Sequence, residues 1–333
     1  MIDTETIAVV SSADNLYVQH LCAAFASVMV NLSKGWRASF YVIDGGIDVG
    51  NRSKLIRTVT GMGADVELIP ADKESYGDLF IASDRHITLA AYYRLSIPEL
   101  FKDKAYEKVI YLDCDLIAVD DLSKLWQTQL RQYPLAAVQD PGGGERLAKL
   151  GIPEGESYFN SGVMLINLAR WRELSVTERT LRFLRENRHR LYYHDQDGLN
   201  AVLYGQWLQL HPRWNVQRAM FSRKIRAELP WSFGIEAREG CREPGIVHFT
   251  GTSKPWQFDN AHPYKREYYR YLRMTEWKEF RPAVGLRLAL RRLAKLVLPA
   301  SLHSVFAKMK FRSVANQDVR RGHSSHAEEE GIR

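Results

Sequence analysis

The sequence predicts an α/β fold with a mostly parallel central sheet and helices on both faces. Short apolar runs alternate with amphipathic segments over residues 1–280, which is the rhythm of repeated βαβ units. One of these runs, 109–112, ends abruptly in the triplet Asp-Cys-Asp. Polar groups at a strand end indicate function, because open α/β sheets bind ligands beyond the carboxyl ends of their strands.

Each element follows from the local pattern of side chains. Buried apolar runs predict strands, in chain order, at 7–12, 39–44, 65–70, 108–113, 135–140 and 162–168. Small and apolar residues at helical spacing predict helices at 16–32, 50–60, 87–100 and 176–190. The third helix is expected to stop near Pro98, because proline lacks the N–H that continues a helix. We assign residues 1–280 to one catalytic domain.

Charge is distributed unevenly along the chain. The net charge of +7 comes from 46 basic and 39 acidic residues. Residues 281–312 hold eight of the basic residues and no acidic one, and residues 313–333 hold three basic and four acidic ones. Residues 1–280 are therefore neutral, with 35 of each sign. A nucleic-acid-binding function has no electrostatic support in that part of the chain.

The C-terminal residues predict a basic amphipathic helix. Between 285 and 299, aliphatic side chains lie on one helical face and basic side chains lie on the other sides. We assign residues 281–312 to a helical tail that associates with an anionic membrane surface. The alternative is a helix that packs its apolar face on the protein's own core. Residues 313–333 are expected to be disordered.

Several features favour the cytoplasm. The three cysteines, Cys22, Cys114 and Cys241, lie far apart without a CxxC motif, which favours free thiols in a reducing compartment. No signal peptide is evident at the N-terminus, and no run of 18 apolar residues predicts a membrane span. Together with the basic tail, these features predict a protein at the inner face of the cytoplasmic membrane.

Asp113 and Asp115 are the first candidate site. Residues i and i+2 of a strand point to the same face, so the two carboxylates would lie together at a strand end. Such a pair is a hard oxygen site for Mn²⁺ or Mg²⁺, and it cannot easily stay ionised and buried without a counter-cation. The alternative is an ordinary pair of turn or helix-cap residues at the surface.

A second candidate is the stretch HFTGTSKPW at 248–256. His248 ends another apparent strand and could complete a metal site. Backbone N–H groups near Gly251 and the ammonium of Lys254 could hold phosphate. The alternative is a hydrogen-bonded core histidine with a surface lysine.

Three further clusters are polar and follow predicted strands or aromatic pairs. HDQDGLN at 194–200 could form a polar wall against a sugar, or its Asp197 and Asn200 could simply cap a helix. Asn160, just before a strand, could reach the same cleft, or it could be a turn residue. In SSADNLY at 11–17, Asp14 and Asn15 could bind a nucleotide and Tyr17 could stack on its base, or Asp14 could cap a helix.

Other common sites are excluded by their missing motifs. No GxGxxG follows the first strand and no GxxxxGK[ST] occurs, which disfavours dinucleotide oxidoreductases and P-loop enzymes. GxSxG and HExxH are also missing.

Taken in order, six stretches resemble glycosyltransferase family 8, which includes bacterial lipopolysaccharide and lipooligosaccharide galactosyl- and glucosyltransferases and the glycogenins. The stretches are SSADNLY, RHITLAAYYRL, KVIYLDCDLIAVDDLSKLW, YFNSGVMLINLARW, HDQDGLN and HFTGTSKPW. The likeness covers roughly residues 5–275. It implies the GT-A nucleotide-diphospho-sugar transferase fold and transfer of galactose or glucose from a UDP-sugar, with retention of configuration, to a saccharide or glycolipid acceptor such as lipopolysaccharide.

The resemblance also implies roles for single residues. Asp113, Asp115 and His248 match the Mn²⁺ ligands of the family, with Mg²⁺ as the alternative ion, and Gly251 and Lys254 match its diphosphate clamp. The remaining matches are Asp14 and Tyr17 at the uridine, Arg94 and Cys114 in the donor site, Asp140 and Asn160 at the donor sugar, and Asp195 and Gln196 under the sugar ring.

The chain departs from the family pattern at two positions. Leu16 stands where many relatives have asparagine, so one polar contact near the nucleotide is in doubt. Cys114 replaces a larger aliphatic residue at the centre of the D-x-D motif. Neither change removes a metal ligand.

The sequence leaves the mechanism and the activity open. We favour a same-face substitution in which the leaving phosphate helps to deprotonate the acceptor, because Gln196 is a poor nucleophile. A carboxylate at Asp195 keeps a double displacement open. The rival activities are a catalytically silent sugar-nucleotide-binding protein and a nucleotidyltransferase, although the latter should carry a basic Gly-rich loop after the first strand.

Overall fold

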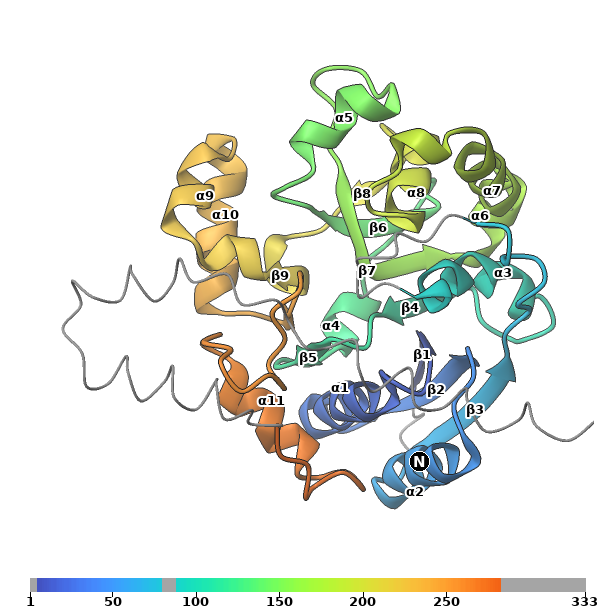
Figure 1. The fold of residues 1–333 in the computed structure, drawn as a ribbon, viewed down its shortest axis with the longest axis vertical. Coiled ribbons are helices and arrows are strands. Elements are labelled where there is room, and N and C mark those ends of the chain that lie inside the picture. Colours follow the sequence, from blue (N-terminus) through green and yellow to red (C-terminus); the bar gives the residue numbers. More distant parts are fainter. Residues whose placement is uncertain (1–4, 80–87, 283–333) are drawn as a thin grey trace, which may run out of the picture. The chain divides into compact units, whose positions relative to one another are not determined.

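A seven-stranded sheet forms the centre of the computed structural model, which describes residues 5–79 and 88–282 (Figure 1). Its strand order is β3-β2-β1-β4-β7-β6-β8. The bounds are β1 Glu5–Ala13, β2 Trp36–Asp44, β3 Asp65–Pro70, β4 Lys108–Leu112, β6 Leu135–Gln139, β7 Phe159–Asn167 and β8 Leu208–Gln209. Only the contacts of β7 with β4 and β6 are antiparallel within this sheet. The predicted α/β fold with a mostly parallel sheet is confirmed.

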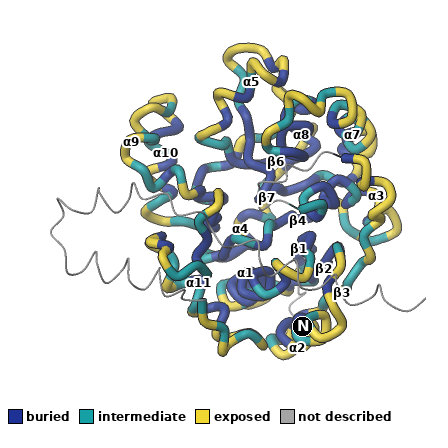
Figure 2. The backbone as a smooth tube through the Cα atoms, viewed as in Figure 1, coloured by how far each residue is buried: buried dark blue, intermediate teal, exposed yellow. Residues whose placement is uncertain are grey.

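Helices cover both faces of this sheet, as the sequence predicts. Alternate residues of each strand point to opposite faces, so Ile7 and Val9 of β1 pack in one core and Ala8 and Val10 in another. The first core is closed by α1 (Val18–Asn31) and α2 (Val49–Gly61). The second is closed by the 3₁₀ helix η1 (Leu89–Ser96) and by α3 (Ile97–Leu100), α6 (Leu168–Glu173), α7 (Val176–Glu186) and α8 (Asp195–Leu203). Figure 2 shows the central strands as the most continuously buried part of the chain.

A small second sheet lies beside the first, and of its strands the sequence predicts only the one that ends at His248. It contains β5 (Leu116–Ala118), β10 (Ile246–His248) and β9 (Val216–Gln217), with β10 in the middle. Strand β5 begins four residues after β4 ends, so the Asp113–Asp115 turn joins the two sheets. Strands β5 and β9, of three and two residues, are too short to show a periodic pattern in the sequence.

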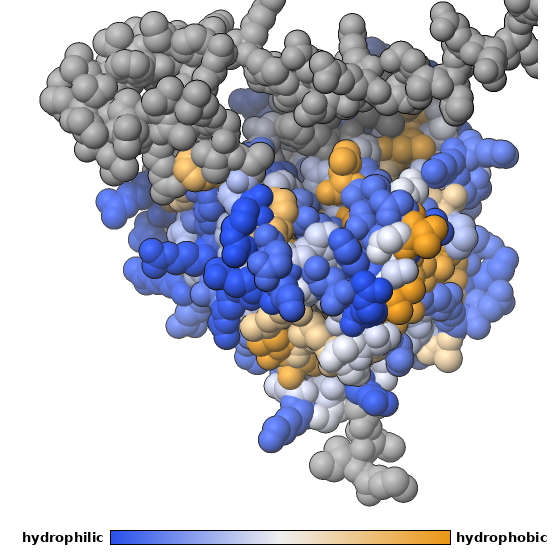
Figure 3. Space-filling view, turned by 60° about the horizontal axis from the view of Figure 1, so that its bottom comes forward, coloured by the Kyte–Doolittle hydropathy of each residue, from blue (hydrophilic) through white to orange (hydrophobic). Residues whose placement is uncertain are grey.

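The remaining described elements are short or lie at the edge of the fold. They are α4 (Ser123–Trp126), α5 (Gly144–Leu150), η2 (Arg188–Arg190), η3 (Pro212–Asn215), η4 (Arg218–Phe221), α9 (Arg223–Glu228), α10 (Trp231–Arg242) and α11 (Lys265–Leu272). Most of the face in Figure 3 is hydrophilic, with hydrophobic side chains in separate patches between charged ones, as on an ordinary protein surface.

Two predictions about local structure are wrong. The predicted helix at 87–100 is a 3₁₀ helix followed by a short α-helix, and Pro98 lies in the first turn of that second helix, where its missing N–H has no cost. Asn160 lies inside β7 and not before it. The aromatic Phe159 extends the strand past the point where the aliphatic run begins.

The basic helix and the terminal segment, 281–312 and 313–333, fall almost wholly outside the described residues. The domain boundary at 280 and the membrane role of the tail stay predictions. Within the described part of the chain, every helix is too short or too polar to cross a bilayer.

Candidate active site

A cavity of about 860 Å³ opens beside the carboxyl ends of β1 and β4. All thirteen predicted site residues line it. They come from the turns after β1, β4 and β6, from η1, β7 and α8, and from the end of β10 and the loop that follows it. The topology therefore brings together residues that are up to 240 positions apart, Asp14 and Lys254 among them.

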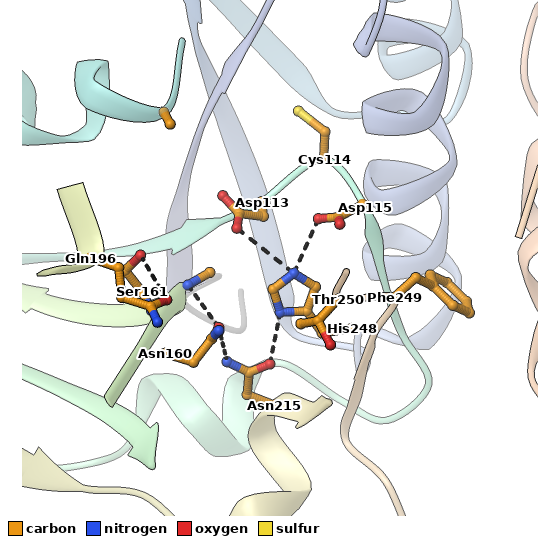
Figure 4. Close-up of polar contacts among 12 residues, drawn as sticks. Asp113, Cys114, Asp115, Asn160, Ser161, Gln196, Asn215, His248, Phe249 and Thr250 are labelled. Atoms are coloured by element: carbon orange, nitrogen blue, oxygen red, sulfur yellow. Dashed lines mark hydrogen bonds and ion pairs between the residues drawn. The ribbon is translucent and has the colours of Figure 1, made fainter. Parts of the chain in front are cut away.

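Three of these residues could hold a metal ion. Ligand atoms of Asp113, Asp115 and His248 all lie within 4.8 Å of one another. The His248 Nε2 atom is 3.1 Å from Asp115 Oδ1 and 3.7 Å from Asp113 Oδ2 (Figure 4). The strand pairings explain this approach: His248 lies opposite Leu116 in the small sheet, directly after the D-x-D turn.

The outer oxygens of both carboxylates are held by other side chains. Asp113 Oδ1 accepts hydrogen bonds from Arg94 Nη2 at 3.0 Å and from the Tyr111 hydroxyl at 2.9 Å. Asp115 Oδ2 accepts one from the ammonium of Lys254. Burial would raise the pKa of the Asp115 carboxyl, but Lys254 and His248 outweigh it and bring that pKa well below its usual range. Asp115 is therefore a carboxylate at any physiological pH.

This arrangement fits a divalent cation. The donors occupy one oxygen of each carboxylate, which leaves Asp113 Oδ2, Asp115 Oδ1 and His248 Nε2 converging on one point. Two carboxylates with an imidazole suit Mn²⁺, and carboxylates alone suit Mg²⁺. Arg94, Tyr111 and Lys254 orient the ligands in the way that outer-shell hydrogen bonds orient metal ligands in general.

Gly162 makes room for this cluster. The backbone N–H of Asp113 donates to the Gly162 carbonyl at 2.8 Å, so β7 runs directly beside the D-x-D turn. A Cβ atom at residue 162 would lie 2.2 Å from His248 Cε1 and 2.6 Å from Asp113 Oδ2. Only glycine fits there. The sequence shows Gly162 in a strand, which often marks a close approach, but we did not interpret it so.

Cys114 lines the cavity, but its thiol points away from the metal ligands (Figure 4). Its Sγ lies 3.2 Å from the carbonyl oxygen of Ser12, in the core. Burial raises the pKa of the thiol well above its ordinary value, so the side chain stays neutral.

The predicted phosphate clamp, Gly251 and Lys254, follows β10. Gly251 has a φ of +81°, which side chains other than glycine rarely adopt, and the turn it forms brings Lys254 back over the cavity. The Lys254 ammonium, which is 8% exposed, donates to the Phe249 carbonyl as well as to Asp115. A cationic group is thus fixed beside the ligand cluster.

Tyr17 and Asp14 line the other end of the cavity. Asp14 Oδ1 accepts the backbone N–H groups of Leu16 and Tyr17 at 3.0 and 3.1 Å, so it holds the turn before α1. The Tyr17 ring contacts Trp256 edge-on, at 6.0 Å between centroids. Asn15, which could also bind a nucleotide, bonds instead to the backbone N–H of Asp48.

Arg94 bridges the metal cluster and the sugar-side residues. Its guanidinium, 4% exposed, lies 3.0 Å from Asp113 and 3.0 Å from Asp195, and it also donates to the Ser161 carbonyl at 2.7 Å. Burial raises the pKa of the Asp195 carboxyl to about 6, although Arg94 opposes this shift. His194 precedes Asp195 with a φ of +54°, a strained conformation of the kind found at functional sites.

Asp140, Asn160 and Gln196 form a hydrogen-bonded group on the floor of the cavity. Asp140 Oδ2 accepts from Asn160 Nδ2 at 3.2 Å and from Gln196 Nε2 at 3.1 Å. Gln196 Oε1 accepts the backbone N–H of Ser161 at 3.0 Å. The structure therefore brings these three predicted sugar-binding residues together.

Asp197 and Asn200 do not cap a helix, so that interpretation is wrong. Asp197 is fully buried, pairs with Arg146 at 2.9 Å and accepts the Tyr158 hydroxyl at 2.7 Å. Asn200 pairs with both backbone groups of Phe159. Asn200 anchors α8 to β7, whereas Asp197 anchors it to α5, to Tyr158 and to the backbone N–H groups of Tyr192 and Tyr193. The sequence alone does not distinguish such anchors from site residues.

Comparison with known proteins decides the family. The model described as "Glycosyl transferase family 8" matches residues 8–260. The chain belongs to glycosyltransferase family 8. Among relatives of this family 8 chain, General stress protein A of Bacillus subtilis is 41% identical over 286 residues, which cover 84% of this chain and 98% of that protein. The lipopolysaccharide 1,2-glucosyltransferase of Escherichia coli is 30% identical over 198 residues, or 58% of this chain and 56% of that protein.

A solved structure shows the same fold. The galactosyltransferase LgtC, in complex with donor and acceptor sugar analogues, superposes with a TM-score of 0.74 and 26% identity, over 85% of this chain and 99% of that chain. The GT-A fold of this family 8 glycosyltransferase is thereby confirmed.

Proposed function

We propose that this glycosyltransferase moves galactose or glucose from a UDP-sugar to a saccharide acceptor, with retention of configuration and with Mn²⁺ as cofactor. The observation that carries the proposal is the convergence of three ligand atoms within 4.8 Å, beside Lys254 and inside one large cavity. The relatives support the sugar: one is a glucosyltransferase and one a galactosyltransferase. The acceptor we propose is a lipopolysaccharide or another cell-surface glycan, since the Escherichia coli relative acts on lipopolysaccharide.

The chain's own residues would act on three parts of the donor. A bound divalent ion would supply Lewis-acid stabilisation of the diphosphate. Lys254 adds positive charge where the leaving group gains negative charge, and a preorganised group of this kind contributes ~3 kcal/mol to such a step. Asp195 and Gln196 would face the sugar carbon, which becomes cationic as its bond to the diphosphate lengthens.

The contacts of these two side chains support same-face substitution. Gln196 Oε1 accepts from the Ser161 backbone, and Asp195 Oδ2 lies 3.0 Å from Arg94 and 3.3 Å from the Ser161 hydroxyl. Oxygens held in this way suit charge stabilisation better than bond formation. A hexosyl adduct on residue 195 or 196, detected by intact mass spectrometry, would contradict this route.

The test is incubation with UDP-galactose or UDP-glucose, with and without Mn²⁺, followed by measurement of the released nucleotide. We expect UDP, released by slow hydrolysis and faster when a saccharide acceptor is added. UMP would indicate a nucleotidyltransferase. Donor binding without release of either nucleotide would indicate a silent binding protein.

The pKa of Asp195 predicts an acid limb in this activity. The carboxyl titrates at about 6, so the carboxylate that faces the cationic sugar carbon is lost as the pH falls below that value. Since kcat/KM reports groups of the free enzyme, we expect it to fall about tenfold per pH unit below the pKa. Asp195→Asn should lower the activity and remove this limb. A wild-type limb that persists in the variant, with Mn²⁺ occupancy measured at each pH, would reject the assignment.

A further inference from the structure

Asn215 contacts the metal ligand His248 from behind. It is the last residue of η3 and is fully buried. Its Oδ1 atom lies 3.0 Å from His248 Nδ1, on the side of the imidazole opposite to Asp113 and Asp115 (Figure 4). Asn215 is not among the predicted site residues, and no motif in the sequence points to it.

The orientation of the Asn215 amide is determined by the backbone. The Gly162 N–H can only donate, and it donates to Asn160 Oδ1 at 3.1 Å. Asn160 therefore turns its oxygen toward Asn215, which must offer its NH₂ group to that oxygen, at 2.9 Å. The other end of the amide, the Asn215 oxygen, is thereby left facing His248.

An oxygen facing Nδ1 determines the tautomer of the imidazole. Nδ1 must carry the proton and donate it to Asn215, so the lone pair of the neutral ring lies on Nε2. That atom is the one directed at Asp113 and Asp115. The backbone N–H of Gly162 thus fixes the orientation of the Asn160 and Asn215 amides. The Asn215 amide in turn fixes the tautomer of His248 that metal binding requires.

The same amides reach the sugar side of the cavity. The side-chain oxygen of Asn160 accepts hydrogen bonds from Gly162 and Asn215. Its NH₂ group therefore faces Asp140 and donates to Oδ2 at 3.2 Å. Gln196 donates to that same oxygen at 3.1 Å. Five side chains, from His248 through Asn215, Asn160 and Asp140 to Gln196, form one hydrogen-bonded chain in which every donor meets an acceptor.

We propose that Asn215 is a positioning residue with two separate effects: it holds His248 in the tautomer that binds the metal, and it orients Asn160 for the sugar-side residues. The second effect rests on the proposed transferase function, whereas the first concerns metal binding alone. An apolar replacement should remove both effects. A carboxylate should keep the first, because it still accepts from Nδ1, and lose the second, because it has no proton for Asn160.

The experiment compares Asn215→Leu and Asn215→Asp in the full chain. Binding of Mn²⁺ is followed by electron paramagnetic resonance of the free ion, and UDP release is measured at saturating Mn²⁺. We expect the leucine variant to bind Mn²⁺ about 10–100-fold more weakly, the usual effect of removing an outer-shell partner. The aspartate variant should keep the affinity within about threefold and release UDP roughly tenfold more slowly.

Two measurements separate positioning from mere structural support. In ¹⁵N spectra of the wild type saturated with diamagnetic Mg²⁺, which displaces any proton shared with Asp115, His248 should show a protonated Nδ1 and an Nε2 without a proton, and the leucine variant should lose this pattern. Asn187→Leu is the matched control: its amide caps α7 by donating to Phe183 at 3.0 Å, and it does not line the cavity. It should lower thermal stability and leave the Mn²⁺ affinity unchanged.

Two results would overturn the inference. One is wild-type Mn²⁺ affinity in Asn215→Leu. The other is an equal loss of affinity in both Asn215 variants together with an equal loss of thermal stability, which is what a structural role predicts. A wild-type protein that binds no Mn²⁺ or releases no UDP would instead contradict the proposed function.

Discussion

Replacing Asp115 by asparagine is expected to abolish Mn²⁺-dependent release of UDP. The variant loses the negative charge that attracts the cation and that pairs with the Lys254 ammonium. Loss of Lewis-acid stabilisation, which is worth several kcal/mol, corresponds to a rate reduction of about 10³ or more. Mn²⁺ binding should weaken in parallel when it is measured directly by electron paramagnetic resonance.

Asp120→Asn is the control for this change. Asp120 lies five residues further on, pairs with Arg213 at 2.7 Å and with Lys124 at 2.8 Å, and does not line the cavity. The sequence places both acidic residues in one stretch, VIYLDCDLIAVDDL, and the structure separates them. Its neighbour Asp121 accepts the backbone N–H of Ser123, the first residue of α4, at 2.9 Å. Full activity in Asp115→Asn would reject the metal site.

Gly162→Ala should disturb the same site without removing a ligand. The new Cβ would lie 2.2 Å from His248 Cε1 and 2.6 Å from Asp113 Oδ2, distances that no real Cβ tolerates. Strand β7 cannot move away, because it pairs with β4 and β6 on either side. The imidazole must therefore shift. We expect Mn²⁺ affinity to fall about 10–100-fold and UDP release to fall at least as much at limiting Mn²⁺.

Two further variants show whether the clash is the cause. Gly61→Ala is a matched change at the end of α2, with no atom within 4 Å of the new Cβ. It should keep metal binding and stabilise the helix by up to ~1 kcal/mol. Adding His248→Ala to Gly162→Ala should recover the thermal stability that the clash with the imidazole costs, and it should abolish metal binding because it removes a ligand. An unstable double variant would show that the strain has another source.

Sequence patterns predicted six of the seven strands of the main sheet, because these strands, unlike the two-residue β8, are long enough to show a pattern. Strand β3 is found at the predicted residues, 65–70, and the other five predicted strands of that sheet differ by a few residues at their ends. The site residues were located through their motifs, of which SSADNLY, the D-x-D turn and HFTGTSKPW lie at strand ends. Their placement around one cavity then follows from the parallel arrangement, which puts carboxyl ends at one edge.

Residues that position other site residues were not predicted from the sequence, and the reason is physical. Asn215 and Gly162 touch His248 only because β10, η3 and β7 meet in space, and no local spacing records that meeting. Tyr111 could have been found: it lies two residues before Asp113, and alternate residues of a strand share a face. We treated it as part of an apolar run, but its hydroxyl holds Asp113 at 2.9 Å.

The D-x-D turn connects two sheets that have no strand in common, and this has a mechanical consequence. Asp113 follows β4 of the large sheet and His248 ends β10 of the small one. A cation bound by both residues would therefore link the two sheets. The small sheet rests on α1 through Ile117 and Val247, which pack against Ala23 and Ala26. The distance between the ligands therefore depends on the small size of Ala23 and Ala26, neither of which lines the cavity. A larger side chain at either position would shift the small sheet and change the affinity for the ion.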